Sequence, residues 1–513
     1  MTAHAELAAC PPASVLAMPN GAARPLSDVP RCELDALHRL VTGAPARDRR
    51  VSALFGLPAG DRTELVAVLA DDTGGLVELA RAELDGARFP SMTPMCPQVQ
   101  LFEREIAEQW GVIPEGHPWL KPVRFQPPRR ARSPLAPGAA PAIGTSEFYA
   151  IEGGEVHEVA VGPVHAGVIE PGHFRFQCYG ETVLHLEISL GYQHRGVERA
   201  LVGGPGPRSI HYAETLAGDT TVGHATAYCQ AIEALAGAAV PARGLALRAI
   251  ALELERLANH VGDLGALSGD VGFLPTAAFC GRLRGDYLNL TAELCGSRFG
   301  RGLVRPGGTR FDVTPELAAQ LGQRVARALH DTEEAAHLLW DTGSVQSRFE
   351  ETGRVAPEIA AQLGVVGPVA RACGLHRDVR TTHPTGYYRF AHVPISTAWS
   401  GDVFARAFVR FLEIQRSVEL VRRELALLPG GATTCQVPAL LPEHITVSLV
   451  EGWRGELCHV ALTDRAGRFA AYKVVDPSFH NWMALALALR GQQVSDFPLC
   501  NKSFNLSYCG HDL

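Results

Sequence analysis

Residues 126–145 constrain most strongly how this chain can fold. The segment reads QPPRRARSPLAPGAAPAIGT and is rich in Pro, Arg and Ala, a composition that favours an extended linker over a packed element. A hydrophobically patterned segment lies on each side of it, and 513 residues are enough for more than one core. The sequence therefore predicts two domains, at 31–125 and 146–513, behind a poorly ordered Ala- and Pro-rich leader at 1–30.

The first of these domains has the pattern of a small α+β fold. VSALFGLP at 51–58 and ELVAVLAD at 64–71 are typical of two strands joined by a tight turn. LVELARAELD at 76–85 predicts a helix. LFEREIAEQWG at 101–111 predicts a second, amphipathic helix that ends at Gly111.

The second domain is predicted to be mostly helical with small antiparallel sheets, which puts the whole chain in the α+β class. Strand alternation comes first, with a turn at Tyr179-Gly180. Helical periodicity then runs over 211–339 and again over 402–428. Strand patterning returns at 444–478, around the turn sequence DRAG.

Composition narrows the classes of function. A net charge of −7 is the wrong balance for a protein that binds nucleic acid. No run of about 18 apolar residues reaches the length of a membrane span, and no signal peptide is visible, so a cytoplasmic protein is expected. The 12 cysteines form no Cys-x-x-Cys pair, whereas zinc and iron–sulfur sites need paired thiolates. No Gly-rich dinucleotide fingerprint is evident, so we expect the chain to bind no cofactor of its own.

Residues 162–233 carry His, Arg and Glu at a density that a passive core does not need. Four histidines fall here: His165, His173, His194 and His224. A histidine can carry protons, bind a metal or satisfy a structural hydrogen bond. A single one is most often structural, but four in one segment favour a functional role.

The order of several blocks is similar to one known family. From residue 252 to residue 482 the chain reads, in order, LELERLANHVGDLGALSGDVGF, VRPGGTRFD, LGVVGPVARACGLHRDVRTTHP, VEGWRGEL and DPSFHNW. These blocks resemble the large subunits of nickel–iron hydrogenases, in particular the membrane-bound branch, a family that includes the quinone-site subunit of respiratory complex I. Residues 89–125 resemble the small C subunit of complex I and its counterpart fused into formate-hydrogenlyase-type large subunits. The resemblance implies a domain like the C subunit at 31–125, followed at 146–513 by a domain like the hydrogenase large subunit and the D subunit of complex I.

The resemblance identifies a loop where the hydrogenases bind nickel. Their loop reads Arg-x-Cys-Gly-x-Cys, with a histidine four residues after the second cysteine. His224 matches that histidine, which puts the cysteine positions at Ala217 and Thr220, around Gly218. Neither position carries a thiol.

The second cysteine pair of the hydrogenases lies in a C-terminal Asp-Pro-Cys-x-x-Cys. Here the end reads NKSFNLSYCGHDL, the matching positions are Ser507 and Gly510, and Cys509 stands one residue out of place. Nickel needs soft thiolate ligands, so no nickel–iron centre and no metal are expected. The resemblance then implies a cavity for a quinone headgroup lined by Ala217, Gly218, Thr220, His224, Ser507 and Gly510.

Proton donors for such a headgroup are sought in IEPGHFR. Hydrogenases carry Ile-Glu-Gly-His-Leu-Arg, whose Glu relays protons, and Glu170 matches it with Pro171 inserted. Ungapped matching to complex I instead puts Ile169 where a quinone-contacting histidine stands. His165, Glu170 and His173 are therefore the candidate catalytic groups.

Asp270 is a fourth catalytic candidate. It follows His260 as an acid does in the complex I subunit, and an acid buried on a helix face has a raised pKa and can relay protons. The alternative is a helix-terminal residue that caps the next turn.

The GYQHRG loop is the candidate contact with a partner. Tyr192, His194 and Arg195 follow the end of a predicted strand, and the resemblance places this loop near an iron–sulfur subunit. The alternative is a structural ion pair between Arg195 and Glu198.

Three functional hypotheses remain. The first is a hydrogenase-like subunit of a membrane-associated, complex I-related oxidoreductase that passes electrons from a partner's 4Fe–4S cluster to a quinone. Its partners would be an iron–sulfur small subunit, antiporter-like membrane-arm subunits and NADH-oxidising or ferredoxin-like subunits, at the cytoplasmic face of the membrane. The second is a true hydrogenase with displaced ligands such as Cys509 and Cys229. The third is a non-catalytic scaffold.

We expect the purified protein to contain no nickel, because Ala217, Thr220, Ser507 and Gly510 offer no soft ligand. Elemental analysis of the purified complex measures this, with a nickel–iron hydrogenase as positive control. A content of about one nickel per chain would contradict the assignment of these four positions.

Overall fold

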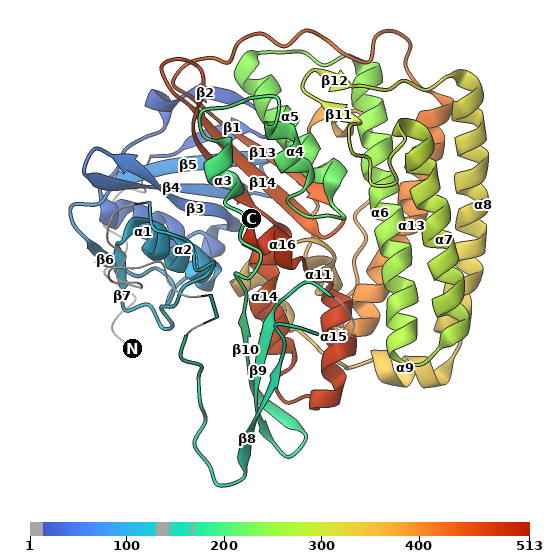
Figure 1. The fold of residues 1–513 in the computed structure, drawn as a ribbon, viewed down its shortest axis with the longest axis horizontal. Helices are drawn as coiled ribbons and strands as arrows, with labels where there is room; N and C mark the ends of the chain where they lie inside the picture. Colours follow the sequence, from blue (N-terminus) through green and yellow to red (C-terminus); the bar gives the residue numbers. More distant parts are fainter. Residues whose placement is uncertain (1–13, 130–142, 145, 166–168) are drawn as a thin grey trace. The chain divides into compact units, whose positions relative to one another are not determined.

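The computed structural model describes residues 14–129, 143–144, 146–165 and 169–513. The chain divides into two compact units at Pro141/Ala142, except that Asn20–Arg24 belong to the second (Figure 1). This division falls inside the segment predicted as a linker, most of which lies outside the described residues. The domain boundaries therefore stay a prediction.

The first unit is built on an antiparallel sheet with the strand order β1-β5-β4-β3. The hairpin predicted from two alternating runs is confirmed, and α2 ends before Gly111 as expected, since Gly111 takes the left-handed conformation with φ 72°. The elements of this unit are β1 (Leu16–Pro19), α1 (Leu34–Thr42), β3 (Arg49–Ala59), β4 (Arg62–Asp71), β5 (Leu76–Glu83), β6 (Arg88–Pro90), α2 (Gln100–Trp110) and β7 (Ile113–Glu115).

The prediction of a helix at 76–85 is wrong. This segment forms β5, which pairs with β1 on one side and with β4 on the other. A run as short as LVELARAE fits helical periodicity and strand alternation alike. Leu79, Ala80 and Ala82 are fully buried, so the ladders on both sides decide the conformation.

The prediction of a poorly ordered leader at 1–30 is wrong for its second half. β1 pairs with β5, and β2 (Ala23–Pro25) joins a sheet of the second unit. Between them, the Asn20 amide donates to the Leu449 carbonyl at 2.9 Å and accepts from the Leu449 N–H at 2.7 Å. The composition of this segment does not indicate that it pairs with residues so far away in the sequence. Residues 1–13 lie outside the described residues.

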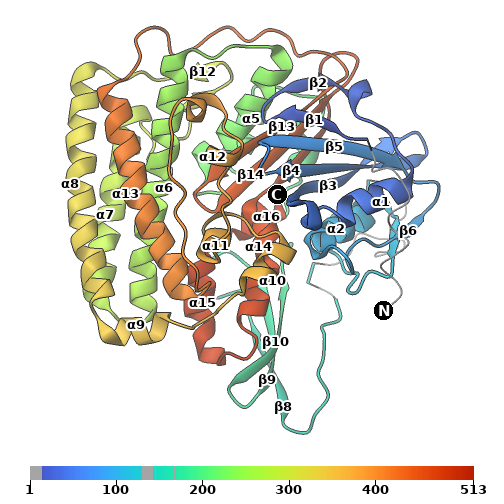
Figure 2. The same ribbon diagram turned by 180° about the vertical axis from the view of Figure 1, so that it is seen from behind.

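Four long helices lie side by side in the second unit (Figure 1, Figure 2). They are α6 (Ala242–Asp270), α7 (Leu274–Cys295), α8 (Pro315–Trp340) and α13 (Val403–Ala426). Leu257, Val261 and Val418 belong to the apolar core that they share. Within the described part of the chain, every helix is too short or too polar to cross a membrane.

A second sheet lies next to this bundle, with the strand order β15-β14-β13-β2. It is formed by β13 (His444–Gly452), β14 (Gly455–Thr463), β15 (Phe469–Val475) and β2, and α5 (Thr221–Ala236) packs on β13 and β14. A third sheet, of β8 (Val156–Val161), β9 (His173–Tyr179) and β10 (Thr182–Ser189), extends away from the bundle (Figure 1). The predicted α+β class is confirmed.

Short helices and strands complete the second unit. They are α3 (Val197–Leu201), α4 (Ser209–Glu214), β11 (Val304–Arg305), β12 (Gly308–Thr309), α9 (Gly343–Phe349), α10 (Pro357–Leu363), α11 (Gly367–Ala372), α12 (Val379–Thr382), α14 (Pro477–Ala488), α15 (Phe497–Phe504) and α16 (Tyr508–Asp512).

Charged side chains are buried where α6, α11, α12, α13 and β13 meet. The Arg371 guanidinium lies 2.7 Å from a Glu413 oxygen and 2.7 Å from a Glu451 oxygen. Arg380 lies 3.1 Å from Glu253. None of these side chains is more than 2% exposed, and a buried charge is tolerated only when it is paired in this way.

Replacing Glu413 by Gln keeps the size of the side chain but removes the charge that faces Arg371 and His260. Arg371 keeps Glu451, but it loses one of its buried carboxylate partners and His260 loses its own, so the free energy of unfolding should fall by about 3 kcal/mol. Urea unfolding measures this change. Glu334→Gln, at an exposed position of α8, is the control and should shift stability by about 0.5 kcal/mol at most. A Glu413→Gln variant as stable as the control would contradict this role.

Candidate functional site

Three segments that are far apart in the sequence meet at the Cys509 thiol. The Glu170 carboxylate and the Gly218 backbone are within hydrogen-bonding reach of it, and the Ser507 hydroxyl is 3.4 Å away. The Tyr508 N–H donates to a Glu170 oxygen at 3.2 Å. The structure thus places the IEPGHFR segment, the ETLAGDTTVGHA loop and the C-terminal residues around one point.

The positions predicted to line a cavity differ in exposure. Gly218 is exposed, and an added Cβ there would meet no atom within 4 Å. The side toward Gly218 is therefore open. The remaining positions are buried: Ala217, Thr220, His224, Ser507 and Gly510.

Space is most limited at Gly510. Gly510 lies in α16, whose N-cap Ser507 accepts a hydrogen bond from the Gly510 N–H at 2.9 Å. An added Cβ at Gly510 would come within 2.5 Å of an Asp476 oxygen. The Asp476 carboxylate therefore occupies the space that a side chain at this position would need.

His224 links Asp476 to two residues that sequence reasoning missed. His224 Nε2 is 3.2 Å from the Asp476 carboxylate, and His224 Nδ1 is 3.1 Å from His459 Nε2. His459 Nδ1 is 2.9 Å from the Tyr472 hydroxyl. All four side chains are at most 3% exposed. The sequence offered two signals for these residues. The first was the polar residues within the strands β14 and β15, and the second was the Asp-Pro pair, in which Asp476 caps α14 and Pro follows it.

An ion pair fixes the loop that precedes α5. Two Arg454 nitrogens contact the Asp219 carboxylate, one of them at 2.8 Å. The Arg454 guanidinium also lies over the Trp453 ring, 3.9 Å from its centroid, and donates to the Asn505 carbonyl. Burial alone would raise the pKa of Asp219, but Arg454 holds it below its usual value. The sequence analysis missed Arg454, although it lies in the family block VEGWRGEL.

The GYQHRG loop is tied to the C-terminal segment. His194 Nδ1 is 2.7 Å from the Asp512 carbonyl oxygen, and Arg195 donates to the Cys509 carbonyl at 2.9 Å. Tyr192 is half-buried, and burial raises its pKa. The three residues predicted to face a partner therefore lie next to the candidate site.

The two histidines of the hairpin make backbone hydrogen bonds. His165 Nε2 is 3.0 Å from the Gly172 carbonyl, and His173 Nδ1 is 3.1 Å from the Gly162 carbonyl. Arg175 Nε donates to His173 Nε2 at 3.3 Å. His173 Nδ1 must then donate, which makes its ring a neutral imidazole with both nitrogens engaged.

The premise that Asp270 is buried on a helix face is wrong. Asp270 is the last residue of α6 and is exposed, near Lys502. The α6 acid that reaches the C-terminal segment is Asp263, which accepts from the Asn505 amide at 2.6 Å and lies 2.8 Å from Arg410. The two acids are one heptad apart and so share a face of α6, but Asp270 lies at the end of the helix, where partial burial still raises its pKa as predicted.

The side chains present do not fit a nickel centre. Cys509 is the one thiol at the junction just described, and burial together with Glu170 raises its pKa to about 11. Cys229 lies elsewhere, in α5 near Arg248 and Glu233, and burial raises its pKa as well. Over the residues that the structure describes, no group of three or more His, Cys, Asp or Glu side chains is arranged to hold a metal ion.

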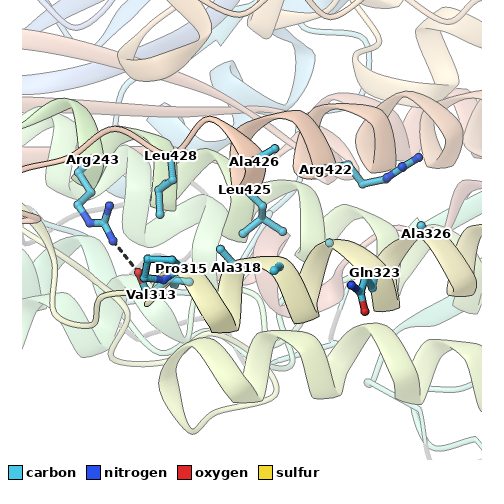
Figure 3. A pocket seen from close by; sticks show the side chains of 12 residues that line it. Arg243, Val313, Pro315, Ala318, Gln323, Ala326, Arg422, Leu425, Ala426 and Leu428 are labelled. Atoms are coloured by element: carbon cyan, nitrogen blue, oxygen red, sulfur yellow. Dashed lines mark hydrogen bonds between the residues drawn. The ribbon is translucent and has the colours of Figure 1, made fainter.

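A separate hollow lies on the helix bundle. Figure 3 shows this pocket of about 670 Å³ between α8 and α13, with Pro315 and Ala318 facing Leu425. Arg243 donates to the Val313 carbonyl at one end of it. None of the predicted site residues lines this pocket.

Two sequence families match the chain. "Respiratory-chain NADH dehydrogenase, 49 Kd subunit" matches residues 270–443, and "Respiratory-chain NADH dehydrogenase, 30 Kd subunit" matches residues 27–135.

Three individual proteins are also similar to the chain. Formate hydrogenlyase subunit 5 of Escherichia coli (strain K12) is 30% identical over 444 residues, which cover 83% of this chain and 78% of that protein. Hydrogenase-4 component G of the same organism is 29% identical over 84% of this chain and 77% of its own length. NADH-quinone oxidoreductase subunit 4 of Thermus thermophilus is 29% identical over 67% of this chain and 90% of its own length.

Alkylation should show that Cys509 is a protonated thiol at neutral pH. With a pKa of about 11, its thiolate fraction should rise about tenfold for each pH unit between 8 and 10. Iodoacetamide labelling followed by mass spectrometry measures the rate, with half-buried Cys435 as the internal reference. Labelling of Cys509 at pH 8 as fast as that of Cys435 would instead indicate an accessible thiolate, the form that binds soft metals.

Proposed function

This chain belongs to the family of hydrogenase and complex I large subunits, with a complex I 30 kDa-type domain fused ahead of the 49 kDa-type domain, and we propose that it passes electrons to a quinone-type acceptor without a nickel–iron centre. It is a subunit of a complex I-related oxidoreductase. The observation that carries the proposal is the set of side chains around Cys509. Carboxylate, hydroxyl and a protonated thiol meet there, where the hydrogenases of the family gather four thiolates.

The open side of the junction supports a site for the headgroup. The space beside Gly218 is free of neighbouring atoms, and Glu170 is only partly buried. On the opposite side, Asp476 closes the space at Gly510. We therefore restrict the proposed cavity to the region between Gly218, Glu170 and Cys509, rather than to all six positions suggested by the resemblance.

Glu170 is the best-placed proton donor in this proposal. Its carboxyl group contacts both the Tyr508 N–H and the Cys509 thiol, so its position is held from two sides. A general acid must lie within hydrogen-bond reach of the atom that it protonates. His165 and His173 are second choices, because their ring nitrogens already bond to backbone carbonyls.

The surroundings of the site suggest where electrons enter. Arg195 is exposed while its guanidinium is fixed on the backbone of the C-terminal segment. We propose that Tyr192, His194 and Arg195 face an iron–sulfur subunit carrying a 4Fe–4S cluster. Membrane-arm subunits and an NADH- or ferredoxin-oxidising module would complete an assembly on the cytoplasmic face of the membrane, and this chain would bind no cofactor of its own.

One observation favours a second candidate, a non-catalytic scaffold. Ala217 is fully buried, and Thr220 and Ser507 are each 1% exposed. Asp476 also fills the space at Gly510. Most of the region that corresponds to the metal site of the related hydrogenases is therefore packed with protein atoms. A scaffold would keep the fold and the partner surface without turnover.

Replacing Glu170 by Gln separates the two candidates. The variant keeps the size but loses the titratable proton, so quinone reduction by the intact complex should slow about tenfold or more. Assembly, followed by native electrophoresis, should not change. Glu181→Gln, in the exposed turn between β9 and β10, is the matched control.

His165→Ala and His173→Ala complete the series. If these variants and Glu170→Gln all assemble and reduce quinone at the control rate, the proposed donors are wrong. A wild-type complex that assembles but reduces no quinone would favour the scaffold.

A further inference from the structure

A chain of four buried side chains runs beneath the candidate site and has no place in the function proposed above. Its members are Tyr472, His459, His224 and Asp476, joined by hydrogen-bonding distances of 2.9, 3.1 and 3.2 Å. The first two lie on the sheet, on β15 and β14. The last two begin α5 and cap α14. These four hydrogen-bonded side chains come from the sheet and from two helices, so they do more than cap a single helix.

When Asp476 is ionised and both imidazole rings are neutral, hydrogen-bond chemistry allows one order of protons along this chain. An ionised Asp476 can only accept, so His224 Nε2 must donate to it. His224 Nδ1 is then the acceptor of a neutral imidazole and receives the proton of His459 Nε2. His459 Nδ1 is in turn an acceptor, which receives the Tyr472 hydroxyl proton. Every bond has one donor and one acceptor, and all of the donors point the same way.

The burial of His459 agrees with a neutral ring at this position. Burial lowers the pKa of His459 well below its usual value. Burial raises the pKa of Tyr472 well above its usual value. Although burial would raise the pKa of Asp476, the hydrogen bond from His224 and the charge of Arg454 bring it below its usual value.

The two ends of the chain lie at different places in the unit. At one end, the Tyr472 ring is 6.0 Å from the ring of Tyr228, measured between centroids, and Tyr228 lines a pocket of about 700 Å³ that is open to solvent. At the other end, Asp476 lies against Gly510 in the C-terminal segment. The chain therefore runs from a ring that lies next to the wall of this pocket to the base of the candidate site.

We propose that Tyr472, His459 and His224 form a proton relay that recharges Asp476 from the Tyr228 side. A proton from solvent is taken up by the Tyr472 oxygen as its hydroxyl proton passes to His459 Nδ1. The His459 Nε2 proton passes to His224 Nδ1, and the His224 Nε2 proton passes to Asp476. In sum, one proton enters at Tyr472 and one arrives on Asp476, with no change in electrons. Both rings are then protonated on Nδ1, and tautomerisation back to the Nε2–H form restores the starting order.

This inference rests on the proposed function, because a proton relay needs an acceptor that takes up protons on reduction. Within that function, Tyr472, His459 and His224 are positioning and relay groups rather than residues that touch the substrate. Asp476 would serve as the inner proton store, and Glu170 as the group at the open side of the site.

The first test needs no variant. With ¹⁵N-labelled histidine in the full chain, NMR should show His224 and His459 as neutral rings protonated on Nε2 near pH 7. Tyr472→Phe should remove the preference of His459 for that tautomer. A cationic ring, or a proton on Nδ1 of either residue in the wild type, would overturn the proton order that the relay requires.

The second test uses the intact complex. Tyr472→Phe should lower the rate of reduction of a soluble ubiquinone analogue about tenfold and change a curved dependence of rate on D₂O fraction into a linear one. Reduction of ferricyanide, which takes up no proton, should be unchanged. Tyr287→Phe is the matched control, because it also removes a buried hydroxyl, one that lies 3.5 Å from Thr332 in the helix bundle.

The outcomes separate the relay from the proposed function. A wild-type complex that reduces ferricyanide but no quinone would refute both the proposed function and the use of the relay. A wild-type complex that reduces quinone, with Tyr472→Phe equal to Tyr287→Phe in rate and isotope dependence, would refute the relay alone. Equal loss of both reductions in Tyr472→Phe would indicate structural damage, and would likewise count against a role in proton supply.

Discussion

The pairing of buried arginines with carboxylates between the helix bundle and the β13 sheet is the constraint on which the rest of this unit depends. A guanidinium removed from water requires fixed partners, and these come from several elements at once. Arg256 on α6 also donates to the Glu451 carbonyl at 2.7 Å and to the Gly452 carbonyl at 3.1 Å. It thereby fixes the turn after β13. That turn carries Arg454, which holds Asp219 and, with it, the loop before α5.

The candidate site, which these ion pairs hold in place, carries proton-exchanging side chains where the related hydrogenases carry metal-binding thiolates. Thiolates are soft ligands that suit nickel and iron, whereas the groups found here are carboxyls, imidazoles and hydroxyls, which exchange protons. Cys509 remains, but its raised pKa keeps it protonated. Glu170 lies on the open side, while Asp476 and His224 lie beneath. In the function proposed above, these groups supply protons and a neighbouring subunit supplies electrons.

The sequence predicted the fold class, the β3–β4 hairpin and the sheet from β13 to β15, because these elements have long and unambiguous periodicity. It failed at 76–85, because such a short run fits both the helical and the strand period, and strand pairing on both sides decides the conformation. At Asp270 it failed because the spacing from His260 does not show that α6 ends at this residue, where the side chain is exposed. His459 and Tyr472 escaped notice since each is ordinary by itself. What matters is that Tyr472 bonds to His459, and that His459 bonds to His224, which is more than two hundred positions away in the sequence.

The closeness of Asp476 to Gly510 also bears on the history of the chain. A mutation that restored cysteine at position 510 would bring its Cβ within 2.5 Å of the carboxylate, so the reversion would be harmful before it could be useful. Moving the acid first would leave His224 without its acceptor. Each single step toward a cysteine at this position therefore meets a penalty created by the other position. Because each change is harmful without the other, this epistasis disfavours a return to cysteine at position 510 and preserves the groups that exchange protons.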